Sequence, residues 1–206
     1  MLRVGLTGGL ASGKSFVGKT LGDLGCFVIR SDEIGHQVIE PGGEAYAGVV
    51  QEFGTGILNP DGQIDRRKLA ALVFRNPERL AKLNALVHPP VRARTRQILE
   101  AHAATHPHGV AAVEAAILVE TGSYRDYEKL IVAVCSVEQQ IERAMARDGV
   151  THEEVLERLS RQMPLEEKVK YADYLVDTSG TKEETQAQVR AIHESLAALA
   201  QHGGQT

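Results

Sequence analysis

Residues 8–15 form a pattern that is typical of a phosphate-binding loop. The sequence there is Gly-Gly-Leu-Ala-Ser-Gly-Lys-Ser, which matches G-x-x-x-x-G-K-[ST] at every position. The glycines allow backbone N–H groups to turn toward a phosphate, and the following helix adds the partial positive charge of its N-terminus. We therefore predict an ATP-binding loop. Its predicted binding residues are Gly8, Ala11, Ser12, Gly13, Lys14, Ser15 and Phe16.

Two side chains of this motif are expected to act on the phosphates directly. Lys14 would reach the β- and γ-phosphates as a point charge, and the Ser15 hydroxyl would ligate a Mg²⁺ ion that bridges them. We predict that Lys14 is catalytic as well as ATP-binding, and that Mg²⁺ is the cofactor, with ATP as co-substrate. The alternative is a Gly-rich turn with an incidental lysine, which the complete pattern disfavours.

A candidate general base follows the next apolar run along the chain. Asp32 comes shortly after the apolar residues 26–29. In a P-loop fold the end of the neighbouring strand faces the γ-phosphate, so this carboxylate would accept the proton of an attacking hydroxyl. The alternative is a helix cap worth about 1 kcal/mol. Position alone leaves both open.

The elements that must hold these residues alternate between strand and helix. Residues 2–7 and 26–29 are predicted strands, and each is followed by a predicted helix, at 14–25 and 31–40. The apolar runs 110–120 and 130–135 lack alternation, as expected of strands buried on both faces of a parallel sheet. A last strand at 174–177 and a closing helix at 181–200 complete an α/β fold.

Two helical stretches interrupt this alternation. The first contains helical pieces at 42–54, 65–74, 76–88 and 90–106, and the second contains a capping box from Thr151 to Glu154. We expect a single P-loop kinase unit over residues 1–206. Its predicted parts are a core (about 1–42, 108–136 and 172–200), a helical substrate-binding insertion (about 43–107) and a helical lid (about 137–171).

Two arginines of the predicted lid are candidates for ATP binding. Arg143 and Arg147 lie four residues apart, hence on one helix face, where closure of a lid would bring them onto the phosphates. Arginines on a solvated helix face are common, and that is the alternative.

Composition limits the class of protein. The formal net charge of −4 disfavours a nucleic-acid binder. No apolar run approaches the roughly 20 residues that cross a bilayer, and no basic leader precedes a long apolar stretch, so we expect a cytoplasmic protein without a membrane partner. Cys26 and Cys135 lie in apolar runs and are predicted to be reduced. A monomer or a small homo-oligomer fits equally.

Absent motifs narrow the choice among P-loop proteins. The sequence has no N-K-x-D motif, which disfavours a GTPase. The chain is also short for a motor ATPase. A small-molecule kinase remains.

Several motifs in a fixed order resemble the dephospho-CoA kinase family. They run from about residue 2 to about residue 190. The phosphate-binding loop is generic, whereas DGQIDR followed by NALVHP, and then RQMPLEEKVKYAD, are distinctive in combination. The motifs are GLTGGLASGKS, VIRSDEIGH, EPGGEAY, EFGTGILNPDGQIDRRKL, VFRNPERLAKLNALVHPPV, AAILVETG, QQIERAMARDG and RLSRQMPLEEKVKYADYLVDTSG.

This resemblance implies a P-loop kinase with a parallel β-sheet core flanked by helices, a substrate-binding insertion and a lid. It implies transfer of the ATP γ-phosphate to the ribose 3′-hydroxyl of dephospho-CoA, giving CoA and ADP. By position, Asp32 matches the catalytic aspartate, which also contacts substrate, and Arg143 and Arg147 fall in the lid. Substrate-binding roles are implied for Arg66, His88 and Glu120.

Each of the three substrate-side residues also has a structural interpretation. Arg66 would be a surface partner of Asp65 or Glu44. His88, before two prolines, would cap or pack at a helix boundary. Glu120 would merely end a strand in solvent.

The sequence also departs from the family pattern. Arg30-Ser31-Asp32 stands where relatives usually carry D-A-D, Ala116 replaces a common proline, and Thr178 replaces a frequent asparagine. Two other functions stay open. One is another small-molecule kinase, acting on a nucleoside monophosphate, shikimate or gluconate; the other is a nucleotide-sensing protein that binds ATP without an acceptor.

Overall fold

The computed structural model describes residues 1–74 and 76–202, and their contacts divide the chain into two units. The first unit contains Met1–Arg30 and the chain from Ala103 onward, and the second contains Ser31–His102. The phosphate-binding motif belongs to the first unit.

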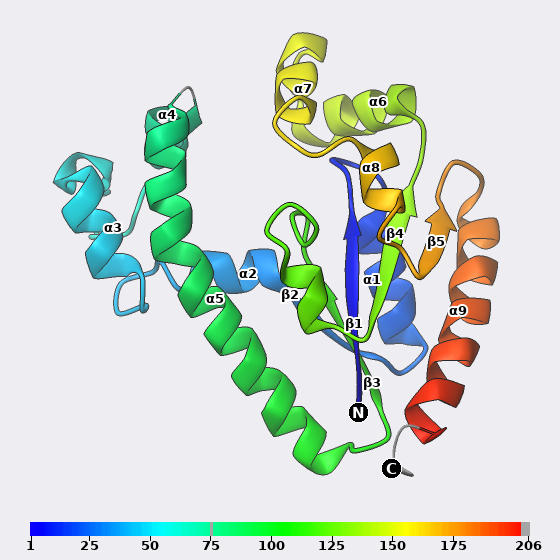
Figure 1. The fold of residues 1–206 in the computed structure, drawn as a ribbon. Helices are drawn as coiled ribbons and strands as arrows, with labels where there is room; N and C mark the ends of the chain where they lie inside the picture. The colour runs from blue at the N-terminus through cyan, green and yellow to red at the C-terminus, as the bar shows by residue number, and fades with distance from the viewer. Residues whose placement is uncertain (75, 203–206) are drawn as a thin grey trace. The chain divides into compact units, whose positions relative to one another are not determined.

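A parallel sheet forms the centre of the first unit (Figure 1). Its five strands have the order β2-β3-β1-β4-β5, and all four pairings are parallel. The bounds are β1 Leu2–Gly8, β2 Phe27–Arg30, β3 Val110–Glu114, β4 Lys129–Val134 and β5 Tyr174–Asp177. The predicted parallel α/β core is confirmed, and the carboxyl ends of β1, β3 and β2 are neighbours at one edge of the sheet.

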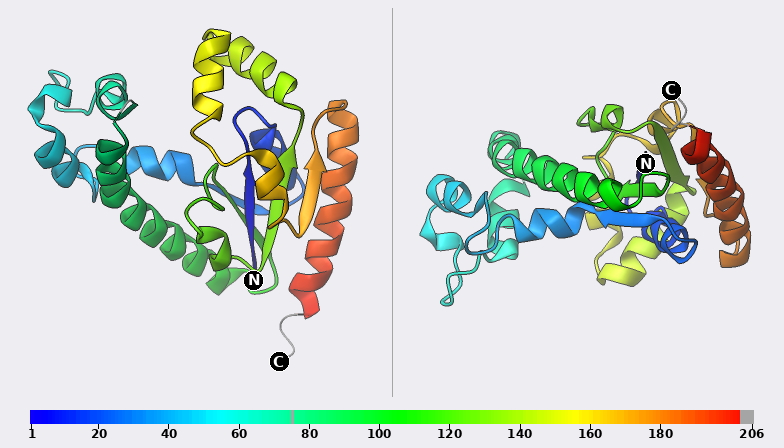
Figure 2. Two further views of the ribbon diagram at one scale, coloured as in Figure 1. Left: turned by 45° about the horizontal axis from the view of Figure 1, so that its top comes forward. Right: turned by 90° about the horizontal axis from the view of Figure 1, so that it is seen from below.

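Each face of the sheet has its own apolar cluster because successive side chains of a strand point to opposite faces. On one face, Ile131 and Ala133 of β4 pack with residues of α1 (Lys14–Asp23) and α9 (Lys182–His202). These two helices lie beside each other along the sheet (Figure 2). On the other face, Leu130 and Val132 pack with the segment that follows β3 and with α8 (Leu165–Val169).

The other helices of the first unit are α6 (Val137–Asp148), α7 (His152–Leu159) and the 3-10 helix η2 (Ser123–Asp126). The predicted capping box at the start of α7 is present, and α6 has a second one, between Ser136 and Gln139. Cys26 and Cys135 are free thiols, as predicted.

Short helices and one long helix make up most of the second unit. Their bounds are α2 Ser31–Gln37, α3 Tyr46–Phe53, the 3-10 helix η1 Thr55–Ile57, α4 Arg66–Phe74 and α5 Pro77–Thr105, the last of which continues into the first unit. The Tyr46 hydroxyl donates to the Gly62 carbonyl at 2.6 Å and so ties α3 to the turn that precedes α4.

The structure differs from the predicted elements in three places. The run 110–120 is not one strand, because β3 ends at Glu114 and the next residues form turns in which Thr121 N–H bonds to the Ile117 carbonyl. The segment's apolar side chains cover a face of the sheet instead of extending it.

The predicted helices 76–88 and 90–106 are one helix of 29 residues, α5, which contains both Pro89 and Pro90. Each proline removes one backbone donor, but the helix continues on both sides of the pair. The predicted helix 42–54 begins only at Tyr46, since Gly42 adopts a left-handed φ of 86° and the chain turns there.

Candidate active site

The loop between β1 and α1 presents unpaired backbone donors. Ala11 and Gly13 have positive φ angles of 52° and 81°, which turn the chain sharply into the helix. Among the described residues, no acceptor pairs with the N–H groups of Ala11, Gly13, Lys14 or Ser15. Such a group of free amides at a helix N-terminus is suited to an anion.

Two other amides that the motif assigns to phosphate binding are used within the loop. The Ser12 N–H donates to the Gly9 carbonyl at 3.3 Å, and the Phe16 N–H donates to the Gly13 carbonyl at 2.9 Å. These two hydrogen bonds stabilise the shape of the loop.

Lys14, Ser15 and Glu114 form a charged cluster beside the loop. The Ser15 hydroxyl donates to Glu114 Oε1 at 2.7 Å, and Lys14 Nζ lies 3.2 Å from the same oxygen. Glu114 is 4% exposed and ends β3, which pairs with β1 in a register that places Glu114 opposite Leu6. Parallel pairing therefore brings this carboxylate to the phosphate-binding loop.

The second carboxylate oxygen of Glu114 is buried and accepts no hydrogen bond from the described residues. Arg30 Nε of the neighbouring β2 lies 3.8 Å from it. Helix α1 passes close by at Gly18, where a Cβ atom would lie 2.8 Å from this oxygen. Glycine at position 18 is thus needed for the carboxylate to lie against the helix.

This cluster fits a Mg²⁺ ion. Mg²⁺ prefers oxygen ligands, keeps several waters and takes few protein groups beside the phosphates of a substrate. The Ser15 hydroxyl and the buried Glu114 carboxylate supply such oxygens at 2.7 Å from each other. Within residues 1–74 and 76–202, no group of three or more His, Cys, Asp or Glu side chains is arranged as a closed metal site.

Arg143 lies next to the loop through Thr178. Its guanidinium donates to the Thr178 hydroxyl at 3.1 Å and to the Thr178 carbonyl at 2.6 Å. The Thr178 hydroxyl donates in turn to the Ser12 carbonyl at 2.9 Å, and Thr178 fills the space where Gly13 lacks a side chain. The threonine at this position therefore connects α6 to the phosphate-binding loop.

Arg147 is engaged elsewhere on the same helix. Its guanidinium donates twice to Asp148, at 2.7 and 3.0 Å, and Arg158 of α7 donates to the same carboxylate at 2.9 Å. The hydrogen bond to Arg147 lowers the pKa of Asp148, and the Arg158 charge adds to this effect. The structure thus brings Arg143, but not Arg147, to the loop.

Glu120 lies in the segment after β3, where its carboxylate is held by two groups. Lys168 Nζ lies 2.8 Å from Glu120 Oε1, and the Met163 N–H donates to the same oxygen at 3.3 Å. Its predicted contact with substrate stays a prediction.

Asp32, Arg66 and His88 belong to the second unit. Asp32 is exposed in the first turn of α2, a position where a carboxylate interacts favourably with the helix dipole. Its role as general base stays a prediction.

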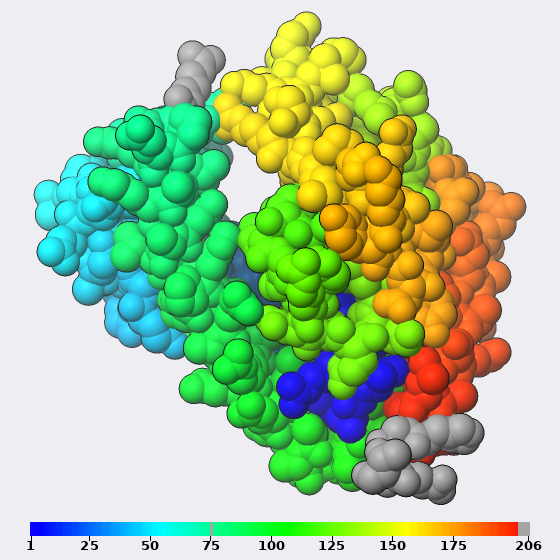
Figure 3. Space-filling view, viewed as in Figure 1, coloured from blue at the N-terminus to red at the C-terminus, as the bar shows by residue number. Residues whose placement is uncertain are grey.

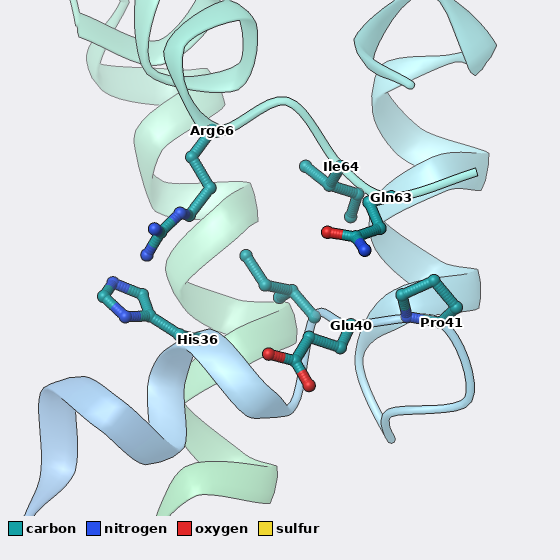
Figure 4. A pocket seen from close by; sticks show the side chains of 7 residues that line it. His36, Glu40, Pro41, Gln63, Ile64 and Arg66 are labelled. Atoms are coloured by element: carbon teal, nitrogen blue, oxygen red, sulfur yellow. The ribbon is translucent and has the colours of Figure 1, made fainter. Parts of the chain in front are cut away.

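Arg66 lines a cavity of about 210 Å³ within the second unit. From the start of α4, its guanidinium points toward the imidazole of His36 in α2 (Figure 4). The alternative that Arg66 is a surface partner of Asp65 or Glu44 is not observed among the described residues. Glu44 pairs with Arg94 at 2.6 Å, and Asp65 pairs with Lys68 at 3.8 Å. In the part of the chain that the structure describes, the Arg66 guanidinium has no ion pair.

His88 lies inside α5, so the prediction that it marks a helix boundary was wrong. Burial lowers its pKa, and the charge of Arg92 lowers it further. A neutral imidazole is therefore favoured in the folded protein. Substrate contact by His88 stays a prediction.

Two residues of the first unit were missed at the sequence level. Glu114 was hidden within the long apolar run, although a charged residue between apolar segments marks a possible strand end. Lys168 lies three residues after Leu165 and four before Ala172, which is the apolar spacing of a helix, but its segment was predicted only as part of the lid.

No helix in the described ranges is both long and apolar enough to pass through a bilayer.

Comparisons with known proteins agree with the geometry of the phosphate-binding loop. Residues 2–184 match the sequence model of the CoaE dephospho-CoA kinase family. A dephospho-CoA kinase of Aquifex aeolicus is 42% identical over 196 residues, which cover 95% of this chain and 98% of that protein. Another, of Geobacillus kaustophilus, is 42% identical over 198 residues, or 96% of this chain and 98% of that protein.

Solved structures show the same fold. A crystal structure of a Thermus thermophilus protein is 31% identical, has a TM-score of 0.77, and covers 95% of this chain and 97% of its own. A dephospho-CoA kinase of Campylobacter jejuni has a TM-score of 0.63 at 24% identity, with 94% of this chain and 96% of that chain covered.

Proposed function

The chain belongs to the dephospho-CoA kinase family, and we propose that it transfers the ATP γ-phosphate to the ribose 3′-hydroxyl of dephospho-CoA, giving CoA and ADP. The structural observation that supports this most is the cluster beside the loop. Free amides at residues 11 and 13–15 accompany a lysine, a hydroxyl and a buried carboxylate at the same end of the sheet.

In the proposed reaction, the 3′-oxygen forms a bond to the γ-phosphorus while the bond from that phosphorus to the β,γ-bridging oxygen breaks. Asp32 accepts the proton of the 3′-hydroxyl. Lys14 and the amides of the loop offset the negative charge on the phosphate oxygens, and ADP leaves.

Ser15 and Glu114 are the residues that would hold Mg²⁺. A Mg²⁺ ion held there would supply positive charge that offsets the negative charge of the phosphates. Glu114 accepts the Ser15 hydroxyl hydrogen and so orients its oxygen lone pairs. Arg30 beside the other carboxylate oxygen offsets the charge of this buried acid, a task consistent with the arginine found at that position.

Arg66, His88 and Glu120 are proposed to contact dephospho-CoA. For Arg66 the support is the polar cavity that it shares with His36, together with a guanidinium that makes no ion pair among the described residues. Dephospho-CoA carries a pyrophosphate, and a guanidinium matches phosphate oxygens in a bidentate manner.

Residues 137–171 are proposed to act as a lid, with Arg143 and Arg147 as its ATP-binding arginines. Arg143 is already beside the loop, whereas Arg147 would have to exchange Asp148 for a phosphate oxygen. We also propose residues 43–107 as the substrate-binding insertion, a cytoplasmic location, and a monomer or small homo-oligomer without nucleic-acid or membrane partners.

The 3′-deoxy analogue of dephospho-CoA tests the proposed acceptor atom. With ATP and Mg²⁺ present, dephospho-CoA should gain one phosphate by mass spectrometry, and the analogue should bind as a competitor without being phosphorylated. Phosphorylation of the analogue would place the acceptor elsewhere and contradict the proposal.

A further inference from the structure

Lys168 of α8 is a lysine without solvent contact. Its side chain is 0% exposed and pairs with Glu120. By contrast, Lys170, which lies two residues after Lys168, has a side chain that is 64% exposed and pairs with Glu167 at 2.7 Å. An ammonium group that leaves water loses a large solvation energy, which close partners must offset.

Three acceptors surround the Lys168 ammonium, which has three N–H groups to donate. They are the Ala116 carbonyl at 2.7 Å, Glu120 Oε1 at 2.8 Å and the Gly8 carbonyl at 3.3 Å. The Ala116 carbonyl also accepts the Thr7 hydroxyl hydrogen at 3.1 Å. Lys168 therefore joins the end of β1 to the segment just beyond β3, and these two adjacent strands lead into the active-site cluster.

The segment after β3 and α8 lie side by side on the face of the first unit that Figure 3 shows. Their side chains belong to one apolar cluster, which includes Leu118, Leu165 and Val169. The Lys168 side chain extends beneath this apolar cluster to the Gly8 carbonyl at the end of β1. Its ammonium is thus excluded from substrate and from solvent alike.

Gly8 is both the last residue of β1 and the first residue of the phosphate-binding motif. A peptide group is planar, so the direction of the Gly8 carbonyl also fixes the direction of the Gly9 N–H. The peptide between Gly9 and Leu10 is held as well, because the Gly9 carbonyl accepts a hydrogen bond from the Ser12 N–H.

Two glutamines from the same part of the chain hold the next residue of the loop. The Gln140 side chain donates to the Leu10 carbonyl at 2.7 Å, and the Leu10 N–H donates to Gln162 at 3.0 Å. A Cβ atom on Gly9 would collide with Gln140. The shape of the loop's first three residues is thus set by side chains from residues 140–168.

We propose that Lys168 is a positioning residue of the ATP site. Its ammonium, held by Glu120, fixes the Gly8 carbonyl and with it the path of the phosphate-binding loop, without touching the nucleotide. The ion pair carries no net charge, and we assign its contribution to the geometry of the loop. This inference rests on the proposed function, because it concerns the same ATP site.

Lys168→Met tests this role, and Lys170→Met is the matched control on the exposed side of the same segment. We expect Lys168→Met to weaken ATP binding in calorimetry on the order of 10-fold, the size of one lost charged hydrogen bond. The KM for ATP should rise. Lys170→Met should bind ATP as the wild type does.

The double variant Lys168→Met with Glu120→Leu separates positioning from stability. Removal of both charges avoids an unpaired buried carboxylate. The urea concentration at the midpoint of unfolding should therefore recover toward that of the wild type. ATP binding should stay weak, because the Gly8 carbonyl still lacks its donor. Glu120→Gln, which retains the lysine, should bind ATP better than Lys168→Met even if the latter folds poorly.

Two results would overturn the inference. One is wild-type ATP affinity in Lys168→Met, and the other is full recovery of ATP affinity together with stability in the double variant. A wild-type protein that does not bind ATP would instead overturn the proposed function, and the inference with it.

Discussion

At the scale of single residues, the candidate charged groups of the two units have separate proposed tasks. The Lys14 and Ser15 side chains both donate to the same oxygen of Glu114, and this contact fixes their position in the phosphate-binding loop. Among the residues that the structure describes, Asp32 has no such partner, and it is exposed in α2. The first group would bind phosphate and metal, whereas Asp32 would act on the acceptor.

Asp32→Asn should therefore lower turnover by about 10² to 10⁴, the size of general-base assistance, with ATP affinity little changed. Steady-state kinetics and ATP calorimetry measure the two effects separately. Glu33→Gln, the next residue of the same exposed turn, is the control. Near-normal turnover in Asp32→Asn would remove this carboxylate from the mechanism.

Glu114→Gln retains the shape of the side chain and removes its charge. We expect Mg²⁺ to bind about 10- to 100-fold more weakly, as when a group that orients a metal ligand is lost. Titration of Mg²⁺ into the ATP-bound protein, followed by calorimetry, measures this. An unchanged Mg²⁺ affinity would remove Glu114 from the proposed metal site.

At the scale of elements, α6 connects the lid segment to the loop through one arginine. Arg143→Ala removes both hydrogen bonds to Thr178. We expect a raised KM for ATP and slower turnover, because the arginine is proposed to close onto the phosphates. Arg158→Ala, an arginine of α7 that pairs with Asp148, is the control. Unaffected ATP kinetics in Arg143→Ala would contradict its role in the lid.

The burial of His88 in the long helix α5 predicts a stability that depends on pH. Burial lowers the pKa of His88 below its ordinary value of 6.5, with a further contribution from Arg92. As the pH falls through about 6.5, the unfolded chain takes up a proton that the folded protein resists, so stability is lost toward acid pH. His88→Gln should reduce this loss.

Urea unfolding of the full chain at about pH 7.5 and pH 5.5 measures the effect. His152→Gln is the control, because this histidine is exposed at the start of α7. If His88→Gln lost as much stability toward acid pH as the wild type, burial of His88 would not be the cause.

How far the sequence predicts these elements depends on how local their determinants are. β5 and the capping box of α7 were predicted correctly because turn and cap residues define them within a few positions. The role of Glu114 was missed because the partners of its carboxylate, Lys14 and Ser15, lie about 100 positions away in the chain. The same holds for Lys168, whose carbonyl partners lie on β1 and beyond β3.

At the scale of the whole molecule, family membership and fold agree with the loop's chemistry. Relatives that are 42% identical cover nearly the full chain, while the sheet and its helices are shared with a solved structure at a TM-score of 0.77. A P-loop fold alone supports kinases for many acceptors. The choice of acceptor is therefore the central claim.

The measurement that tests it most directly is ADP release with ATP and Mg²⁺ against a panel of acceptors. The panel contains dephospho-CoA, shikimate, gluconate and nucleoside monophosphates, and the product's mass is determined in each case. We predict rapid release with dephospho-CoA alone and a product that is one phosphate heavier. Rapid release with another acceptor, or with none of them, would contradict the assignment.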